Sequence, residues 1–286
     1  NILLCHDDLF SLRYEHGGYE EFKISDPKPR IIHKASVRDR LAHHAIYHSL
    51  FPFFDRVFIV DSYSCRINKG PYKAIDRFKS FFYKVSKNNH RTCWVLKCDI
   101  KKFFANIDQE ILISILENRI LDKNIMLLLQ EVIYSFRSTR IGLGLPLGNL
   151  TSQLFANIYM NEFDQFIKND LRIKYYIRYA DDFVILSEDK KRSEEVLLKV
   201  KEFLKNKLKL ELHPNKVSIK TLASGIDFLG WVNFADHRVL RKATKKRMIR
   251  KLANSSTEST VNSYLGLLGH GNTHKSKEKF IYTNNQ

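Results

Sequence analysis

The sequence predicts a globular α+β protein of about two domains. A domain averages ~150 residues, so 286 residues correspond to about two domains. A chain of this length can bury a sizeable hydrophobic core. With 44% hydrophobic residues, among them 20 Phe and 13 Tyr, the chain is neither a disordered tail nor a fibrous repeat. Segments with the apolar spacing of helices alternate with shorter β-rich segments, and two of these meet at Asp181 and Asp182 in the layout of a hairpin.

A strong positive charge indicates a polyanionic partner. The chain has 48 Lys and Arg against 31 Asp and Glu, a formal net charge of +17, which attracts a nucleic acid or an anionic membrane surface. It has no run of about 18 apolar residues and opens with Asn1 rather than a basic-then-apolar signal. We therefore expect a cytoplasmic protein without a membrane partner. The missing initiator Met indicates trimming or further residues upstream.

Cysteines and histidines do not form a recognisable metal motif. The cysteines fit neither a CxxC ribbon nor a dense disulfide frame, so we expect reduced thiols. The pairs His44/His48 and His270/His274 have the i, i+4 spacing that places two imidazoles on one helical face. No third ligand lies nearby in the sequence, which favours helix-surface or nucleic-acid contacts over zinc.

The N-terminal third is predicted to contain one strand and two helices. Two prolines followed by alternating apolar residues over 27–34 predict an edge strand with basic side chains pointing outward. Residues 37–50 have helical spacing, which Pro52 is expected to end. A second helix is predicted over 72–85, after a turn-like NKGP sequence.

A strand is predicted over 94–100, where the sequence is WVLKCDI. Because side chains alternate along a strand, Asp99 emerges at its end on the same side as Val95 and Lys97, away from the more apolar face. The final residue of this segment, Ile100, belongs to the apolar face.

Three further helices are predicted from polar N-cap residues. Asp108 precedes the helical segment 111–121, Asn149 or Thr151 begins a longer helix, and Ser193 begins another. The longer helix carries an aromatic stripe that we expect in the core, formed by Phe155, Tyr159, Phe163 and Phe166.

The chain becomes strongly basic after its last predicted strands, KVSIK and IDFLGWVNF. From His237 to Gln286 there are eleven Lys and Arg against two Glu. A basic helix, RKATKKRMIRKL, leads into a stretch rich in Gly, Ser, Asn and His, which suggests a second, smaller unit. A helix with charge of one sign is as consistent with phosphate contacts as with a solvated face, and the residues in question are Lys245, Lys246 and Arg247.

Three carboxylates are candidates for a metal site. Adjacent acids at a hairpin tip are a weak signal alone, since Asp favours turns. Asp99 strengthens it, because a sheet could bring the end of its strand beside Asp181 and Asp182. Mg²⁺ takes carboxylate oxygens and substrate phosphates, and two ions ~3.5 to 4 Å apart can stabilise both oxygens of a phosphoryl transfer. On a basic protein such ions would also let phosphate approach the carboxylates.

Several segments, in order and with matching separations, resemble the motifs of reverse transcriptases. IRYADDFVIL looks like the YxDD hairpin, KCDIKKFFANID resembles the first catalytic motif, and GLPLGNLTSQ resembles the template-and-nucleotide motif. KPRIIHKASVRDR matches the basic fingers motif, LHPNKVSIK the lysine-bearing motif and GIDFLGWV the primer grip. The matches run from about residue 20 to residue 275.

This resemblance implies a right-hand polymerase fold. The palm would be an antiparallel sheet carrying the YADD hairpin, with fingers on one side and a small basic helical thumb on the other. The implied boundaries are fingers at 1–90 and 109–140, palm at 91–108 and 141–234, and thumb at 235–286.

The chain is similar specifically to the reverse transcriptases of diversity-generating retroelements. The similarity lies in GxxxSQ, where group II intron enzymes usually show GxxxSP, together with HHAIYHSL, DSYSCRINKG and SYLGLLGHGNTH. The similarity implies cDNA synthesis from dNTPs on an RNA template with a DNA or RNA primer, errors opposite adenine, and a small basic accessory protein. The alternatives are a defence-associated or group II intron-derived reverse transcriptase, or an inert RNA-binding protein, against which the intact aspartates argue.

The resemblance also implies roles for the acidic residues. Asp99 and Asp181 would be the main ligands of two Mg²⁺ or Mn²⁺ ions, with Asp182 beside them and the Ile100 carbonyl as a further ligand. One ion would activate the primer 3′ hydroxyl, and the other would hold the triphosphate. Lys216 would protonate the departing pyrophosphate, with a plain surface role as the alternative.

A nucleotide pocket is implied beside the metals. Phe104 matches the steric gate against a ribose 2′-OH, and Gly148 would let the backbone approach the nucleotide closely. Leu147 stands where many reverse transcriptases have Gln and the diversity-generating group has a branched aliphatic residue, which puts fidelity in doubt.

Basic residues would neutralise the triphosphate. Lys28 and Arg30 on the fingers strand are the candidates, with Lys34 or Arg38 as alternatives because the register is uncertain by a few residues. The remaining residues of the implied nucleotide site are Lys101, Lys102 and Phe103.

Overall fold

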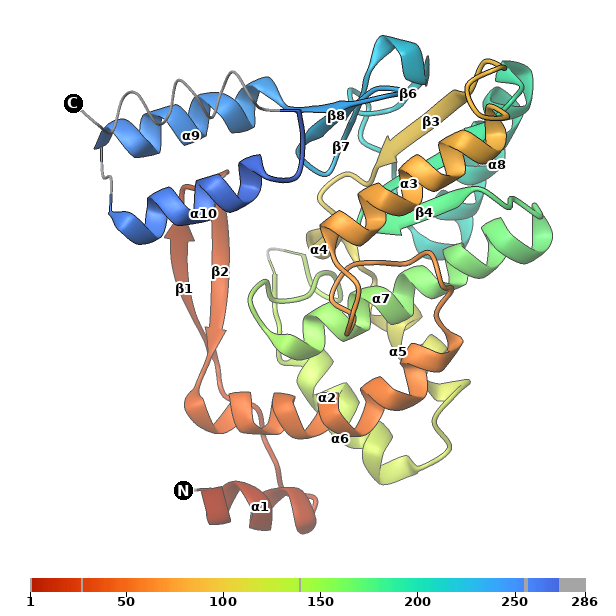
Figure 1. The fold of residues 1–286 in the computed structure, drawn as a ribbon. Coiled ribbons are helices and arrows are strands. Elements are labelled where there is room, and N and C mark those ends of the chain that lie inside the picture. Colours follow the sequence, from red (N-terminus) through yellow and green to blue (C-terminus); the bar gives the residue numbers. More distant parts are fainter. Residues whose placement is uncertain (1, 27, 139, 255–256, 273–286) are drawn as a thin grey trace.

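A four-stranded antiparallel sheet lies at the centre of the protein (Figure 1). The structure is a computed structural model that describes residues 2–26, 28–138, 140–254 and 257–272. The strand order is β4-β5-β3-β6, so the two strands of the hairpin-like segment pair with each other and β5 also pairs with β3. The bounds are β3 Trp94–Asp99, β4 Tyr176–Tyr179, β5 Asp182–Ser187 and β6 Ser218–Thr221.

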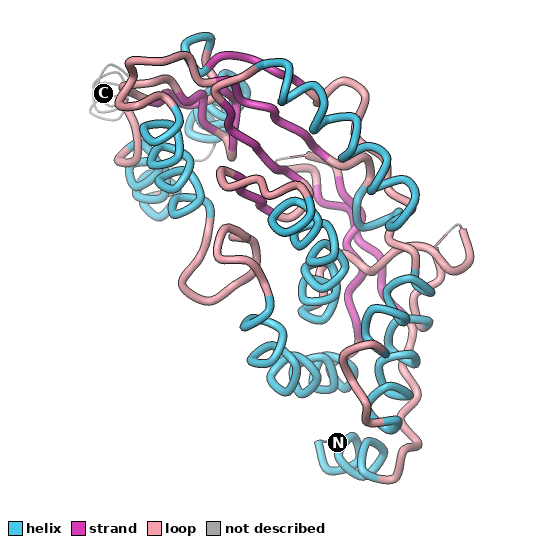
Figure 2. The backbone as a smooth tube through the Cα atoms, turned by 90° about the vertical axis from the view of Figure 1, so that its right-hand side faces the viewer, coloured by secondary structure: helices cyan, strands magenta, loops and turns pink. Residues whose placement is uncertain are grey.

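Helices bury both faces of this sheet (Figure 2). On one face α3 (Pro71–Val85) packs against Val95 and Val184, and on the other α7 (Leu150–Gln165) and α8 (Lys190–Leu208) pack against Leu96. Neighbouring residues of a strand point to opposite faces of the sheet. Because helices cover both faces, the side chains that point to either face are apolar here. The predicted strand 94–100 and hairpin are thus confirmed within a residue or two.

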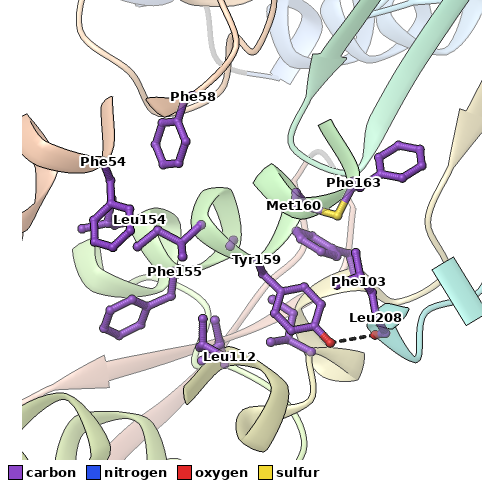
Figure 3. Close-up of a cluster of buried hydrophobic side chains, with 14 of the residues drawn as sticks. Phe54, Phe58, Phe103, Leu112, Leu154, Phe155, Tyr159, Met160, Phe163 and Leu208 are labelled. Carbon is purple, nitrogen blue, oxygen red and sulfur yellow. Dashed lines mark hydrogen bonds between the residues drawn. The ribbon is translucent and has the colours of Figure 1, made fainter. Parts of the chain in front are cut away.

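Helix α7 is the most buried helix of the described chain. Phe155, Tyr159 and Phe163 are at most 1% exposed, which confirms the predicted core stripe, while Phe166 is half-buried. Figure 3 shows side chains of several elements converging on this helix. The Tyr159 hydroxyl donates a hydrogen bond of 2.7 Å to the Leu208 carbonyl, which satisfies the polar tip of a buried ring. The helix therefore ties the palm-like sheet to the elements around it.

The N-terminal part contains a hairpin that projects from this body (Figure 1). The predicted edge strand is β2, and its partner β1 was not predicted, because most of its side chains are exposed. Helix α2 continues through Pro52, contrary to expectation. Burial of Phe51 and Phe54 offsets the lost backbone hydrogen bond there. The bounds are α1 Ile2–Phe10, β1 Tyr19–Ile24, β2 Arg30–Ala35 and α2 Val37–Val57.

Helix starts follow the capping signals with one correction. The Asp108 carboxylate accepts from the Ile111 N–H, as predicted, while Asn149 occupies the N-cap position of α7. Helix α8, however, begins three residues before Ser193, because Asp189 is the cap and Ser193 is buried in the first turn. Helix α6 was not predicted. The remaining bounds here are α4 Phe103–Asn106, α5 Gln109–Glu117, α6 Lys123–Tyr134, a π-helix Phe166–Asp170 and a 3₁₀-helix Leu222–Ser224.

The C-terminal unit combines a small antiparallel sheet with two helices. The basic segment forms α9 as predicted, whereas α10 lies in a stretch whose composition did not indicate a helix. No helix of the described residues is long and apolar enough to cross a membrane. The bounds are β7 Ile226–Phe228, β8 Trp231–Asn233, β9 Arg238–Leu240, α9 Lys242–Asn254 and α10 Glu258–Leu268.

The core around α7 can be tested at Phe163. Its ring lies 5.0 Å from the Phe183 ring and 6.0 Å from the Phe203 ring, so it joins α7 to both the sheet and α8. Phe163→Ala is expected to lower the free energy of unfolding by about 3–5 kcal/mol, because a cavity replaces a buried ring. Urea denaturation measures this. Leu198→Ala, at a side chain 67% exposed on α8, is the control and should cost less than about 0.5 kcal/mol.

Candidate active site

The structure brings the three predicted carboxylates to one end of the central sheet. Asp99, the last residue of β3, pairs directly with Asp182, the first residue of β5. Asp181 lies in the turn before β5, and its carbonyl accepts a hydrogen bond of 3.1 Å from the Ile100 N–H. Asp99 and Asp182, 83 positions apart in the sequence, are therefore neighbours because of one strand pairing.

The backbone around Ile100 is held on both sides. The Asp99 carbonyl accepts from the His213 N–H at 2.7 Å, and the Lys101 N–H donates to the Glu211 carbonyl at 2.9 Å. These bonds place the segment after β3 against the segment that leads to Lys216.

Two lysines pair with these carboxylates. The Lys216 ammonium donates to both oxygens of Asp99, at 2.8 and 2.9 Å. Lys97, which the sequence reasoning did not assign to the site, lies 3.0 Å from an Asp182 oxygen. Its position two residues before Asp99 on the same strand face was the signal that could have identified it. Asp99 and Asp182 are thus each paired with a lysine of their own.

Two of the three carboxylates, those of Asp181 and Asp182, have raised pKa values. Burial raises the pKa of Asp181, the negative charge of Asp99 raises it further, and Lys216 and Arg30 oppose the shift. Burial also raises the pKa of Asp182 to about 6, although Lys97 opposes it. Half-buried acids with incomplete charge compensation are favourable positions for a bound cation.

The donor chemistry fits Mg²⁺. Within the described part of the chain, no group of three or more His, Cys, Asp or Glu side chains is placed so that it could hold a metal ion. Mg²⁺ does not need such a group, since it is commonly held by one or two carboxylates and completed by substrate phosphates and water. Asp99 and Asp181 supply such carboxylates, and the Ile100 carbonyl next to them is a hard oxygen donor.

The implied nucleotide pocket lies where α4, the loop before α7 and strand β2 meet. Phe104 and Leu147 are both half-buried there. The Leu147 carbonyl accepts from the His33 N–H of β2 at 2.8 Å. Gly148 has a φ of +109°, and a Cβ at this position would lie 2.7 Å from a methyl group of Ile32. Glycine is therefore required here to dock the hairpin, a reason that the sequence did not reveal.

The residues before α4 differ in accessibility. Lys101 and Lys102 are exposed, and Lys102 adopts a left-handed φ of 46°. Phe103 is buried in the main core, so only its backbone can reach a nucleotide.

Among the predicted fingers cations, Arg30 is best placed to act on the carboxylates. Lys28 and Arg30 are both exposed, and the charge of Arg30 acts on Asp181. The two alternatives are engaged elsewhere: Lys34 lies 3.0 Å from Glu20 across the hairpin, and Arg38 lies 2.8 Å from Asp8 of α1.

The cations of α9 face the tip of the same hairpin. Lys245 and Lys246 are exposed. Arg247 and Lys251 lie 3.6 and 3.1 Å from the carboxylate of Asp26, in the turn between β1 and β2 (Figure 1). The basic helix and the hairpin thus approach each other.

The histidine pairs do not form a metal site in the described residues. His44 and His48 stack on α2 with ring centroids 6.1 Å apart. His274 lies outside the described residues, so the pairing of His270 with it stays a prediction. All four cysteines are free thiols.

Comparison with known proteins gives a consistent result. A family model described as "Reverse transcriptase (RNA-dependent DNA polymerase)" matches residues 23–233. Protein YkfC of Escherichia coli K12 is 26% identical over 302 residues, covering 91% of this chain and 77% of that protein. The group II intron-encoded protein LtrA of Lactococcus lactis subsp. cremoris is 24% identical, over 84% of this chain and 50% of LtrA.

The fold is also similar to a solved structure. Telomerase from Candida tropicalis, in complex with the TWJ fragment of telomeric RNA, aligns with a TM-score of 0.60 at 12% identity, covering 94% of this chain and 55% of that one. At this identity the similarity shows the fold alone. The chain spans about half the length of the telomerase and of LtrA.

The basic face of α9 can be tested through salt dependence. Changing Lys245, Lys246 and Arg247 together to Gln is expected to weaken binding of a primer–template duplex and to reduce the slope of log K against log salt by ~2 to 3 units, if all three contact phosphates. Fluorescence anisotropy at several salt concentrations measures this. A matched loss of charge on α8, with Lys191, Lys199 and Lys205 changed to Gln, should leave the slope unchanged. If the α9 variant has the same slope as the wild-type protein, these three residues lie on a solvated face and do not contact phosphates.

Proposed function

Because this chain belongs to the reverse transcriptase (RNA-dependent DNA polymerase) family and has the right-hand polymerase fold, we propose that it copies an RNA template into cDNA by two-metal nucleotidyl transfer. The observation that carries the proposal is the pairing of β3 with β5, which puts Asp99 opposite Asp182 and beside Asp181. The substrates would be dNTPs and a DNA or RNA primer. In this reading the fingers, palm and thumb have the boundaries that the motifs imply.

The acidic end of the sheet would bind the metals. Asp99 and Asp181 would supply the main carboxylate ligands, and the Ile100 carbonyl would supply a further oxygen. When bound, two Mg²⁺ ions would lower the pKa of the primer 3′ hydroxyl and stabilise the charge on the leaving pyrophosphate. Asp182 would act mainly through its charge, since Lys97 already holds its carboxylate.

Residues around this end would orient the nucleotide. Lys216, which bonds Asp99, would donate a proton to the departing pyrophosphate, and its contact with one of the metal-binding carboxylates supports this role. Arg30 would neutralise the triphosphate from the fingers hairpin, as its effect on Asp181 supports. Phe104 would exclude a ribose 2′-OH at the edge of the pocket.

For the biological role, we propose the error-prone enzyme of a diversity-generating retroelement. The support is the sequence GNLTSQ at 148–153 and the aliphatic Leu147 before it. Such an enzyme would act in the cytoplasm with a small basic accessory protein. A nearby genomic repeat that differs from its copy mainly at adenines would support this role, and its absence would contradict it.

The second candidate is a group II intron-derived reverse transcriptase. The similarity to LtrA, at 24% identity over 84% of this chain, favours it. Both candidates use the same acidic site, so they differ in template and partners rather than in chemistry.

The site assignment can be tested with Asp181→Asn. The substitution is expected to abolish dNTP incorporation in primer extension on RNA, because a neutral amide cannot replace a charged carboxylate ligand. Primer–template affinity should change by less than about twofold, since Lys and Arg elsewhere make the phosphate contacts. Asp170→Asn, at an exposed aspartate behind the palm, is the control and should retain full activity. Synthesis by the Asp181 variant would contradict the assignment.

Fidelity can be tested with Leu147→Gln. Leu offers packing to a nucleotide but no hydrogen bond, and one hydrogen bond is worth ~0.5 to 1.5 kcal/mol net. At ~1.4 kcal/mol per factor of ten, the variant is expected to lower misincorporation opposite template adenine several-fold, and at most about tenfold. Deep sequencing of cDNA measures the rate, with Leu147→Ile as the control that stays error-prone. Identical adenine error spectra for wild type and the Gln variant would place the source of error elsewhere.

A further inference from the structure

A fully buried arginine lies three residues before Asp181. Arg178, on β4, is 0% exposed, and its guanidinium has five N–H groups to satisfy. The structure satisfies all five. The acceptors are Asp164 Oδ1 at 2.8 Å, Asp164 Oδ2 at 2.6 Å, Asn157 Oδ1 at 3.2 Å, Ser62 Oγ at 3.1 Å and the Ala180 carbonyl at 3.1 Å.

The contact to Ala180 reaches the catalytic turn. Ala180 has a φ of 54°, in the left-handed region that a residue with a Cβ disfavours. The guanidinium bond fixes the peptide that joins Ala180 to Asp181. The next peptide is fixed as well, because the Asp181 carbonyl accepts from the Ile100 N–H. Both peptides that flank Asp181 are therefore held in place.

The arginine itself is immobilised by the core. Its carboxylate partner Asp164 lies on α7 and also accepts a hydrogen bond of 2.6 Å from the Tyr176 hydroxyl. The backbone of Arg178 pairs with a loop on its other side, where its N–H donates to the Asp61 carbonyl at 3.0 Å and its carbonyl accepts from the Tyr63 N–H at 2.9 Å. The guanidinium thus connects α7, through Asp164, to the turn, through the Ala180 carbonyl.

A role in stability alone does not account for this arrangement. Burying an ion pair is costly, and an apolar pair of similar volume often stabilises a core equally well. An apolar pair could not hold the Ala180 carbonyl, however. Of the five guanidinium bonds, the one to Ala180 is the bond that reaches the turn before Asp181.

We propose that Arg178 is a positioning residue for the metal site, which acts through the Ala180 carbonyl to hold the Asp181 carboxylate in one orientation toward Asp99. The proposal rests on the proposed function of Asp181 as a metal ligand. Arg178 touches neither substrate nor metal in this role.

The test is Arg178→Lys, assayed in two ways. Lysine keeps a positive charge beside Asp164 but cannot reach Asp164 and Ala180 together. We expect Mn²⁺ affinity to fall about tenfold, because partners that orient a metal ligand typically matter by this much. Electron paramagnetic resonance of free Mn²⁺, with primer–template and a non-hydrolysable dNTP analogue present, measures it without turnover. In primer extension, kcat should fall about ten- to a hundredfold, and the Mg²⁺ concentration for half-maximal rate should rise.

Two further variants separate positioning from stability. Ser62→Ala removes one bond of the same buried guanidinium but leaves the bond to Ala180, so Mn²⁺ affinity and kcat should match wild type. The double variant Arg178→Met with Asp164→Leu removes both buried charges and keeps an apolar core. It should remain folded, with a somewhat lower unfolding temperature because the buried Tyr176 hydroxyl loses its acceptor, and show the same Mn²⁺ defect as Arg178→Lys.

The outcomes are distinct. Wild-type Mn²⁺ affinity in the folded double variant, or in Arg178→Lys, would overturn the positioning role and leave Arg178 a purely structural residue. Normal Mn²⁺ binding by the wild-type protein without primer extension would overturn the proposed function, while the variants would still test the positioning. A wild-type protein that binds no Mn²⁺ would overturn both.

Discussion

The antiparallel register of β3 against β5 is the constraint on which the rest of the site depends. Leu96 and Cys98 face the core around α7, while Val95 faces the core around α3. A slip of one residue would exchange these faces and drive Lys97 into an apolar core. Burial on both faces therefore specifies the register, and the register in turn sets Asp99 opposite Asp182.

Charge compensation around the site is divided among different elements. Lys97 of β3 pairs with Asp182 across the sheet, and Lys216, from the segment before β6, pairs with Asp99. Within the described parts of the chain Asp181 has no such close lysine, and Lys216 and Arg30 act on its charge at longer range. The acid in the turn is thus the least neutralised of the three. A divalent cation at this end of the sheet would gain most from that acid.

Local sequence patterns predicted those elements in which the burial and the N-cap hydrogen bonds of the structure agree with the pattern. The strand ending at Asp99, the core stripe of α7 and the cap at Asp108 follow from periodicity and side-chain chemistry. Strand β1 was missed because its exposed residues carry no alternation, and α2 outlasts Pro52 because tertiary packing outweighs a local break. The sequence signal fails where the deciding contact lies elsewhere in the chain.

The candidate site also contains residues that a local sequence pattern identifies and residues whose role depends on distant contacts. The aspartates could be found because each stands at the end of a recognisable strand or turn, but Arg178 could not, since its partner Ser62 lies 116 residues away. Gly148 is a related case. Its motif suggested close approach of a nucleotide, whereas the structure shows that Ile32 of the hairpin already needs the space of a missing Cβ. One glycine thus joins the fingers hairpin to the loop of the implied nucleotide pocket, so a larger residue there would displace both surfaces together.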